Sequence, residues 1–394
     1  MYRSILICIF FIINNSLIHS QFLRIGLFND QNTKAIIFSV VSGGYLMSGD
    51  NRAIQTFKTS QNIYIAREGD SLRCIAIGKD FGLFRIVQLN SLADSSSFSL
   101  RPVDPQLNLR YYDDNLELSI QLGKMQTVNV VDIDKYIAGV IESEAGLKAT
   151  SEFYKTQAVL CRTFALSHLD RHTEENFYLC DGTHCQAYNG RNSGMAIILK
   201  AAFDTRGLAI TDKDTIFIIA AFHSDCGGET ESARNVWLID KPYLKPVKDP
   251  YCQNQKNFRW EKKLTLEQWK NYLTENGFHF KPDISTLQLN FTQYRRRQYY
   301  KIESDSISFR KIRTDLNFHS AFFCVEAKEG NVELHGRGYG HGVGLCQEGA
   351  MQMSKLGYDF RKIINFYYQG IMIAEINNVP LIKNPTLKLI EKGN

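Results

Sequence analysis

The segment that most constrains the fold of this 394-residue chain is a helix-like run that is apolar almost all round. It opens near Thr150 or Ser151, where a hydroxyl can cap the first turn, and continues as FYKTQAVLCRTFALSHL. A helix that is apolar on every face belongs inside a core. Gln157 and Arg162 interrupt the run, and both need partners once they are buried. They could satisfy backbone carbonyls, reach a neighbouring acidic residue or contact a ligand.

A shorter amphipathic helix is expected just before it. Asp132 is the expected N-cap, and the pattern predicts one apolar face made of Ile133, Tyr136, Ile137, Val140 and Ile141. At about 100° per residue, Glu144 falls on that face and Glu142 on the opposite one. Gly146 can end the helix. We therefore expect Glu142 to be a solvated carboxylate and Glu144 to point toward the buried side.

Glu144 is the best candidate for an acid in this chain. Apolar surroundings raise the pKa of a carboxyl group, because burial disfavours its charged form. Such a group stays protonated near neutral pH and can act as a general acid. The alternative is a structural carboxylate paired with a cation such as Arg162.

A cluster of potential metal ligands follows within a short stretch: His172, Cys180, His184 and Cys185. Thiolate and imidazole bind zinc, and a structural zinc site needs four ligands. The alternative is a Cys180–Cys185 disulfide, and Cys226 could pair with Cys252 likewise. A zinc ion here would be structural or would shape a cleft, because a hydrolytic site needs an open position and usually more histidine or carboxylate ligands.

The N-terminus is typical of a secretory signal peptide. Residues 1–20 contain one early charge, Arg3, and an apolar run from Ile5 to Ile13 that is too short for a typical membrane anchor. Cleavage is expected ahead of Gln21, with an uncleaved anchor as the alternative. No later stretch is long and apolar enough to cross a membrane, so the mature protein is expected to be soluble and exported.

The region 21–127 is predicted to be a small β domain, because short runs rich in Ile, Val and Phe alternate with Gly, Asn, Asp and Ser. The composition is that of an ordinary globular protein, and the net charge of +5 is too mild to indicate nucleic-acid binding. One basic run, Arg295 to Arg297, is better interpreted as a charged hairpin tip. It could also attract carboxylates of a glycan.

Two later blocks contain further candidate binding residues. AFHSDCGGETES is expected to leave a strand for a polar loop, and a turn is expected at Asp212 to Asp214 in the hairpin before it. His223 and Ser224 do not fit the base and nucleophile of a serine hydrolase, since neighbouring side chains in a strand point to opposite faces. The glycines of HGRGYGHGVG let the backbone approach another backbone or a ligand closely, and the same loop contains His341. Their spacing matches no phosphate-binding motif. The helix that follows offers free N–H donors.

The blocks GVIESEAG, KTQAVLCRTFAL and LCDGTHCQAYNG, followed by the two later blocks, resemble in this order the SpoIID/LytB family. The resemblance covers about Val131 to Ile373. Ala145 and Gly146 replace the family's Met-Pro, Cys161 stands where Ala is usual, and Cys346 stands where Ser is usual.

The resemblance implies an α+β fold, with a β-rich N-terminal part followed by a mixed α/β catalytic domain. We expect a signal peptide at 1–20, a β-rich domain at 21–127, a catalytic domain at 128–380 with a variable subregion at 255–325, and a tail at 381–394. The resemblance also implies that Glu144 is the catalytic residue and that His172, Cys180 and Cys185 are zinc ligands. The expected substrate-binding residues are Gln157, Arg162, Ser224, Tyr339, His341 and Gln347.

The implied activity is that of a lytic transglycosylase of the periplasm or cell envelope, acting on peptidoglycan strands stripped of stem peptides and forming 1,6-anhydro-muramyl ends. No organic cofactor is expected. A two-carboxylate hydrolase needs a second acidic residue at a defined separation, and no second carboxylate has comparable support. The alternative is a non-catalytic amidase enhancer, which binds glycan and stimulates a separate cell-wall amidase.

Overall fold

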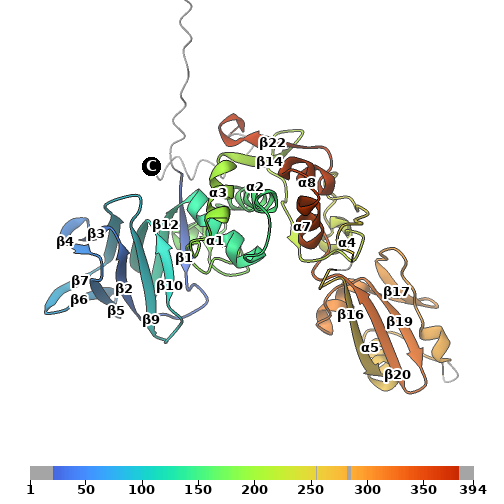
Figure 1. Ribbon diagram of the computed structural model, residues 1–394. Helices are drawn as coiled ribbons and strands as arrows, with labels where there is room; N and C mark the ends of the chain where they lie inside the picture. Colours follow the sequence, from blue (N-terminus) through green and yellow to red (C-terminus); the bar gives the residue numbers. More distant parts are fainter. Residues whose placement is uncertain (1–20, 254, 282–284, 381–394) are drawn as a thin grey trace, which may run out of the picture.

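The structure is a computed structural model that describes residues 21–253, 255–281 and 285–380. Figure 1 shows a β-rich part, a central helical part, a C-terminal part and a lobe that projects from the last of these. The expected signal peptide (1–20) and tail (381–394) lie outside the described residues. Within the described part, no helix is long and apolar enough to cross a membrane. The α+β class and the β-rich N-terminal part are confirmed.

Two largely antiparallel sheets of short strands form the N-terminal part. The larger has the order β13-β1-β12-β11-β8-β3-β4 and the smaller β10-β9-β2-β5-β6-β7. The rings of Phe38, Tyr45 and Phe98 pack between them, with centroids 5.1–5.7 Å apart. The strands are β1 (Phe22–Leu27), β2 (Ala35–Ser42), β3 (Gly44–Gly49), β4 (Arg52–Lys58), β5 (Asn62–Glu68), β6 (Ser71–Ala76), β7 (Lys79–Phe84), β8 (Ile86–Ser91), β9 (Ser97–Asp104), β10 (Arg110–Asp113), β11 (Asn115–Gln121), β12 (Lys124–Asp132) and β13 (Leu179–Cys180).

The expected boundary after residue 127 falls inside β12, which pairs with β1 on one side and β11 on the other. The short strand β13 joins the same sheet in parallel beside β1. The segment that contains the Cys/His cluster is thus attached to the N-terminal sheet by backbone hydrogen bonds. One continuous core runs from this sheet through the helices that follow.

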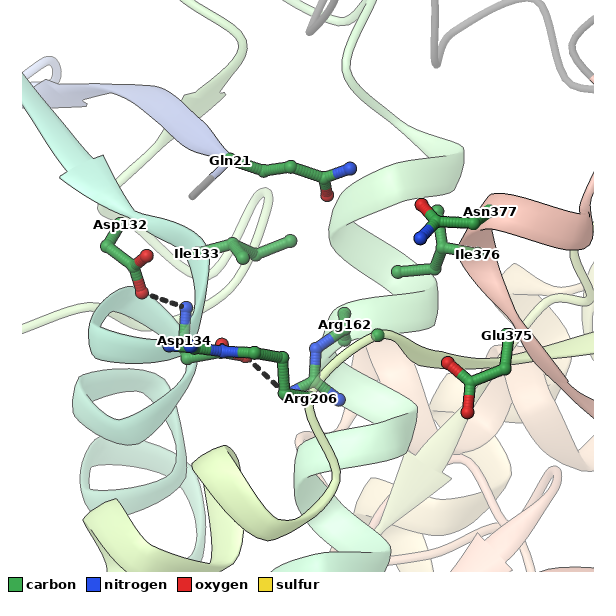
Figure 2. A pocket seen from close by; sticks show the side chains of 10 residues that line it. Gln21, Asp132, Ile133, Asp134, Arg162, Arg206, Glu375, Ile376 and Asn377 are labelled. Carbon is green, nitrogen blue, oxygen red and sulfur yellow. Dashed lines mark hydrogen bonds and ion pairs between the residues drawn. The ribbon is translucent and has the colours of Figure 1, made fainter. Parts of the chain in front are cut away.

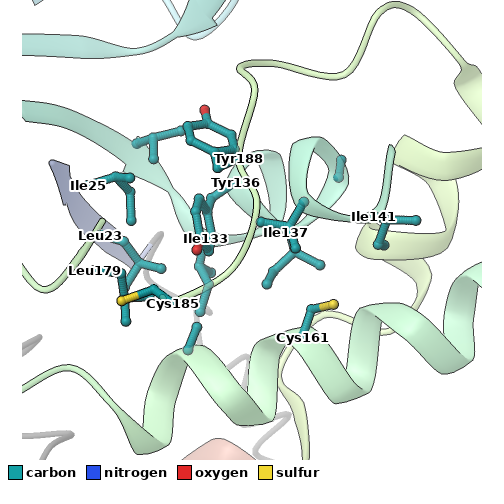
Figure 3. Close-up of a cluster of buried hydrophobic side chains, with 14 of the residues drawn as sticks. Leu23, Ile25, Ile133, Tyr136, Ile137, Ile141, Cys161, Leu179, Cys185 and Tyr188 are labelled. Carbon is teal, nitrogen blue, oxygen red and sulfur yellow. The ribbon is translucent and has the colours of Figure 1, made fainter. Parts of the chain in front are cut away.

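The central helices begin where their caps predict. They are α1 (Ile133–Ala145), α2 (Ser151–Ser167) and α3 (Ala196–Asp204), with a short 3₁₀ turn η1 (Thr173–Glu175). Asp132 accepts a 2.9 Å hydrogen bond from Asp134 N at the start of α1, and Thr150 caps α2. Figure 3 shows Ile137 and Ile141 of α1 facing Cys161 of α2. The prediction that α2 lies in the core is confirmed, because most of its residues are buried.

The C-terminal part is built from small two-stranded sheets and helices. The elements are β14 (Leu208–Asp212), β15 (Phe222–His223), α4 (Ala233–Trp237), β21 (Leu345–Cys346), α7 (Gln347–Lys355), α8 (Phe360–Tyr367), β22 (Ile371–Glu375) and η3 (Ile376–Asn378). The turn after β14 forms, with a 2.8 Å bond from Asp212 N to Ile216 O. The expected hairpin is confirmed around this turn, because Thr211 pairs antiparallel with Phe217. On its other edge, β14 pairs with the distant β22.

An insert lobe, defined here as residues 259–337, has a core of its own. Its sheet has the order β16-β20-β19, and Trp269 is fully buried beneath it. Thr265 and Gln268 form a capping box at the start of the first helix of the lobe. The elements are β16 (Arg259–Thr265), α5 (Leu266–Glu275), η2 (Thr286–Leu289), β17 (Tyr299–Ile302), β18 (Asp305–Ser308), α6 (Phe309–Asp315), β19 (Phe323–Lys328) and β20 (Asn331–Arg337). The sheet therefore extends beyond the subregion expected at 255–325.

The basic run of the lobe is not a hairpin tip. Arg295 forms a 3.2 Å ion pair with Glu229. Arg296 is buried and donates to the carbonyl oxygens of Cys226 at 2.8 Å and Glu229 at 2.7 Å. These two residues dock the lobe onto the loop after β15, because buried carbonyls need donors.

Candidate functional site

Glu144 lies in the last turn of α1, where its side chain is half-buried. Its Oε1 accepts a 2.8 Å hydrogen bond from the backbone N–H of Ala187. Among the described residues, no hydrogen bond reaches its other oxygen, Oε2. The carboxyl group is therefore fixed at one oxygen and available at the other, which suits a group that exchanges a proton with a ligand.

The expectation that Glu142 is freely solvated is wrong. Its Oε2 accepts hydrogen bonds of 2.7 Å from both Asn192 Nδ2 and Ser193 N. The hydroxyl of Ser143 accepts another bond from the same loop. The loop 187–193 thus runs over the end of α1 and is tied to three successive side chains. Helical periodicity predicts the faces of α1 but does not reveal this covering loop.

The buried neighbours of Glu144 are Tyr136 and Cys161, both fully inaccessible to solvent. Burial raises the pKa of the Cys161 thiol, and the Glu144 carboxylate adds to that rise. Burial likewise raises the pKa of the Tyr136 hydroxyl, to which Glu144 makes a smaller contribution. Figure 3 shows both side chains in the cluster between α1 and α2. Glu144 therefore borders a dry core on one side.

Two buried glutamines lie in the elements around Glu144. Gln157 precedes Cys161 by one turn of α2, and neither its amide nitrogen nor its oxygen has a partner in the described part of the chain. Gln186 accepts a 3.4 Å bond from Tyr136 Oη, while its nitrogen has no partner there. An unsatisfied buried polar group costs about 1–3 kcal/mol. Gln157 is fully buried, so it cannot contact a glycan in this conformation.

Arg162 does not reach Glu144. Its guanidinium pairs at 2.7 Å with Asp134, in the first turn of α1 and ten residues from Glu144, or about 15 Å along the helix. It also donates to the carbonyl oxygens of Ala202, Thr205 and Leu208. Figure 2 shows Arg162 and Arg206 around Asp134 beside a small cavity of about 30 Å³. Arg162 is fully buried and is occupied within the fold, so a direct contact with substrate is not supported.

The structure brings the predicted metal ligands together. We call His172, Cys180, His184 and Cys185 the His172 cluster; one ligand atom of each lies within 4.8 Å of the others. Cys185 Sγ lies 3.6 Å from His172 Nε2 and 3.7 Å from His184 Nδ1. No disulfide joins Cys180 and Cys185 in the described structure. His184 completes a set of four, although the expected set named only three residues.

The donor set of the His172 cluster fits zinc. His172 Nδ1 is 2.6 Å from Glu175 Oε1, an interaction that leaves Nε2 free to face the sulfur atoms. A hydrogen bond with Cys180 lowers the pKa of the Cys185 thiol to about 6, which favours the thiolate that binds metal. Cys185 is two residues from Ala187, so the cluster also positions the backbone that holds Glu144.

Three expected binding residues lie around the start of α7. Ser224 Oγ accepts a 3.0 Å bond from Asn257 Nδ2, and the Ser224 carbonyl oxygen accepts one from Glu348 N. Gln347 is in the first turn of α7, and its buried amide nitrogen has no partner within the described residues. Tyr339 is 45% exposed, so its ring is accessible to a ligand.

His341 is held by the backbone at both ring nitrogens. Nε2 lies 2.9 Å from the Phe222 carbonyl oxygen, and Nδ1 accepts a 3.0 Å bond from Val343 N. This pattern corresponds to a neutral ring protonated at Nε2. The ring packs against Trp237, with centroids 5.1 Å apart and the ring planes tilted by 50°, and it lines a cavity of about 200 Å³. Only its ring surface is therefore available to a ligand.

The candidate residues fall into two groups. Glu144 and the His172 cluster lie at the end of α1, whereas Ser224, Tyr339 and Gln347 surround the loop before α7. Across the described residues, no hydrogen bond or ion pair joins Glu144 to the second group. Sequence reasoning missed the roles of Ala187 and Gln186, because a backbone donor and a buried amide leave no distinctive pattern.

Comparison with known proteins gives one family. The profile described as SpoIID, Stage II sporulation protein, matches residues 121–211, which include Glu144 and the His172 cluster. An uncharacterised protein of Brachyspira hyodysenteriae is 31% identical over 259 residues, covering 65% of this chain and 70% of the relative.

Two relatives from Bacillus subtilis have descriptive names. Stage II sporulation protein D is 28% identical over 266 residues, covering 64% of this chain and 76% of the relative. The amidase enhancer is 26% identical over 290 residues, covering 60% of this chain but 40% of the relative. The similarity to these proteins therefore extends well beyond the matched profile.

Proposed function

Since this chain belongs to the SpoIID family, we propose that it acts at the cell wall as a lytic transglycosylase on the glycan strands of peptidoglycan. The names of its relatives, stage II sporulation protein D and amidase enhancer, support a role connected with the cell wall. The proposed location is the cell envelope or periplasm, after export with removal of residues 1–20. Strands without stem peptides are the proposed preferred substrate.

One observation carries the proposal: Ala187 N fixes Glu144 at Oε1, and no hydrogen bond from the described part of the chain reaches Oε2. A single carboxyl group with this geometry can act first as acid and then as base. The nearby Glu142 is bonded to the loop at Oε2, so it is a poor second carboxylate for a hydrolase.

The proposed reaction consumes no water. Glu144 donates its proton to the glycosidic oxygen as the bond from that oxygen to the anomeric carbon breaks. The Glu144 carboxylate then takes the proton from the muramyl 6-hydroxyl, whose oxygen attacks the anomeric carbon. One product ends in a 1,6-anhydro ring and the other carries a free hydroxyl, so Glu144 is returned in its acid form.

The other residues support this chemistry by position. His172, Cys180 and Cys185, with His184, are proposed to hold zinc, which would fix the backbone from Cys185 to Ala187. Tyr339, Ser224 and Gln347 are proposed glycan contacts, because Tyr339 is exposed and the other two lie at the start of α7. His341 would contribute its ring surface. The proposed contribution of Gln157 and Arg162 is to packing around the site.

The test is cleavage of purified stem-free glycan strands, followed by mass spectrometry of the products. Wild type should give ends one water lighter than those of a hydrolase. Glu144→Gln keeps the size but cannot transfer the proton, so turnover should fall by ~10²-fold or more. Glu174→Gln is the matched control, because Glu174 is an exposed glutamate on the surface of the same region. A Glu144→Gln variant that cleaves at the wild-type rate refutes the mechanism.

The second candidate is a non-catalytic amidase enhancer, favoured by the similarity to the relative of that name. Under this alternative, wild type binds glycan strands without cleaving them and increases the rate of a separately purified cell-wall amidase. The same assay separates the two functions, because only the transglycosylase forms anhydro ends when no amidase is added.

A further inference from the structure

A second group of buried metal ligands lies in the C-terminal part. We call Cys226, Asp249, Cys252 and Cys346 the Cys226 cluster; one ligand atom of each lies within 4.8 Å of the others. The three cysteines are fully buried and Asp249 is 1% exposed. They come from the loop after β15, the turn at 249–252 and the N-cap of α7. Three separate segments therefore converge on one point.

The distances fit a metal ion better than a disulfide. Cys226 Sγ is 3.5 Å from Cys252 Sγ, whereas a disulfide requires about 2.05 Å. Zn–S bonds of about 2.3 Å in a tetrahedron separate the sulfurs by roughly 3.8 Å. Cys226 Sγ is also 3.3 Å from Asp249 Oδ2, near the roughly 3.5 Å of a sulfur and an oxygen on one zinc ion. A disulfide would use only two of the four groups.

A bound cation would also complement the buried Asp249 side chain. Asp249 forms no ion pair with any lysine, arginine or histidine in the described part of the chain. A buried charge without a partner is costly, and a bound metal ion is one of the few partners that a core can hold. Backbone N–H groups of Cys226 and Gly349 point at Cys346 Sγ, at 3.3 and 3.4 Å, and so hold this sulfur in place.

Neighbouring groups orient the ligands. Tyr367 Oη donates a 2.9 Å hydrogen bond to Asp249 Oδ2, and Tyr251 N donates a 2.8 Å bond to Oδ1. Gly349 leaves room for this arrangement, because a Cβ there would collide with both the Asp249 carboxylate and the Tyr367 hydroxyl. Such supporting hydrogen bonds are typical of metal sites.

We propose that Cys226, Asp249, Cys252 and Cys346 bind one structural zinc ion, separate from the His172 cluster. The ion would fasten the start of α7 to the loop after β15 and the turn at 249–252. All four ligand positions are filled by protein, so this site has no open position for water and is structural rather than hydrolytic. The proposal does not depend on the transglycosylase activity.

Zinc content of the full chain, purified without added metal, tests the proposal. Wild type should contain about two zinc ions per chain if both clusters are loaded. The double variant Cys180→Ser/Cys185→Ser should retain about one, and Asp249→Asn/Cys252→Ser should also retain about one. Cys324→Ser is the matched control and should keep the wild-type content, because Cys324 lies in the insert lobe outside both clusters.

Cobalt gives a readout that depends on the ligands themselves. The Cys180→Ser/Cys185→Ser variant loaded with Co²⁺ should show thiolate-to-cobalt charge-transfer absorption, and adding Cys252→Ser should reduce it. Absence of both zinc and this absorption in the folded Cys180→Ser/Cys185→Ser variant would overturn the proposal. So would peptide mapping that finds a Cys226–Cys252 disulfide in metal-free wild type.

Discussion

His341 shows how burial sets the charge of a single residue. Burial lowers its pKa to about 4, against an unfolded value of about 6.5. Between these values the unfolded chain binds more protons than the folded one. The stability that His341 contributes is therefore complete above about pH 6.5 and is lost as the pH falls toward 4.

His341→Gln should consequently lose less stability than wild type between about pH 7 and pH 5. Urea unfolding at both pH values measures the difference, and comparison with wild type cancels the contributions of other buried groups. His279→Gln is the control, because His279 is exposed in the insert lobe. Equal losses for wild type and His341→Gln would contradict the prediction.

The sequence predicts single residues only as far as local geometry determines them. Periodicity correctly predicts the burial of Ile137, Val140 and Ile141 in α1, and the caps at Asp132 and Gly146 are confirmed. It could not predict that Glu142 accepts hydrogen bonds from a loop about fifty residues later. It also gave Arg162 several possible partners, and the choice of Asp134 depends on how α1 and α2 cross.

Among the elements, α1, α2 and the turn after α3 are held together by Arg162. Arg162→Leu should lower the free energy of unfolding by about 3–5 kcal/mol, because Asp134 loses a buried partner and three carbonyls lose their donor. Chemical denaturation measures the change. Arg191→Leu is the matched control: its pair with Asp113 is more exposed and should contribute about 1 kcal/mol or less. Similar losses in both variants would rule out the proposed importance of the buried pair.

The segment between α2 and α3 has little regular secondary structure. We therefore expect bound zinc to hold its backbone in place. Cys180→Ser/Cys185→Ser should lower the zinc content by about one ion per chain relative to wild type. It should also increase hydrogen exchange at Gln186 and Ala187, whose backbone lies next to the His172 cluster. A mapped Cys180–Cys185 disulfide, with no loss of zinc in the variant, would show that these two cysteines form a disulfide and do not bind zinc.

For the whole molecule, the predicted order of β-rich and mixed parts is confirmed, but its connections could not be predicted. Strand β12 belongs to the N-terminal sheet and leads directly into α1, so the two parts share one core. The pairing of β14 with β22 spans more than 150 residues. Such contacts depend on tertiary packing, which local patterns do not determine.

Export of the whole chain is tested at its N-terminus. The charged start and short apolar run of residues 1–20 predict a mature protein that begins at or near Gln21. N-terminal sequencing of protein recovered from outside the cytoplasm measures this directly. Recovery of that protein with Met1 intact in the membrane fraction would instead identify an uncleaved anchor.

The insert lobe enters and leaves the rest of the molecule at neighbouring points, because Arg259 at the start of β16 pairs with Arg337 at the end of β20. A unit attached through adjacent ends, with its own core, can be exchanged or deleted with little disturbance of its host. The docking contacts of Arg295 and Arg296 would be lost, together with the hydrogen bond from Gly340 N to His319 O and the ring contact between His319 and Tyr339. This region can therefore be replaced by another folded insert, in evolution or by a protein engineer, while the architecture around Glu144 is kept.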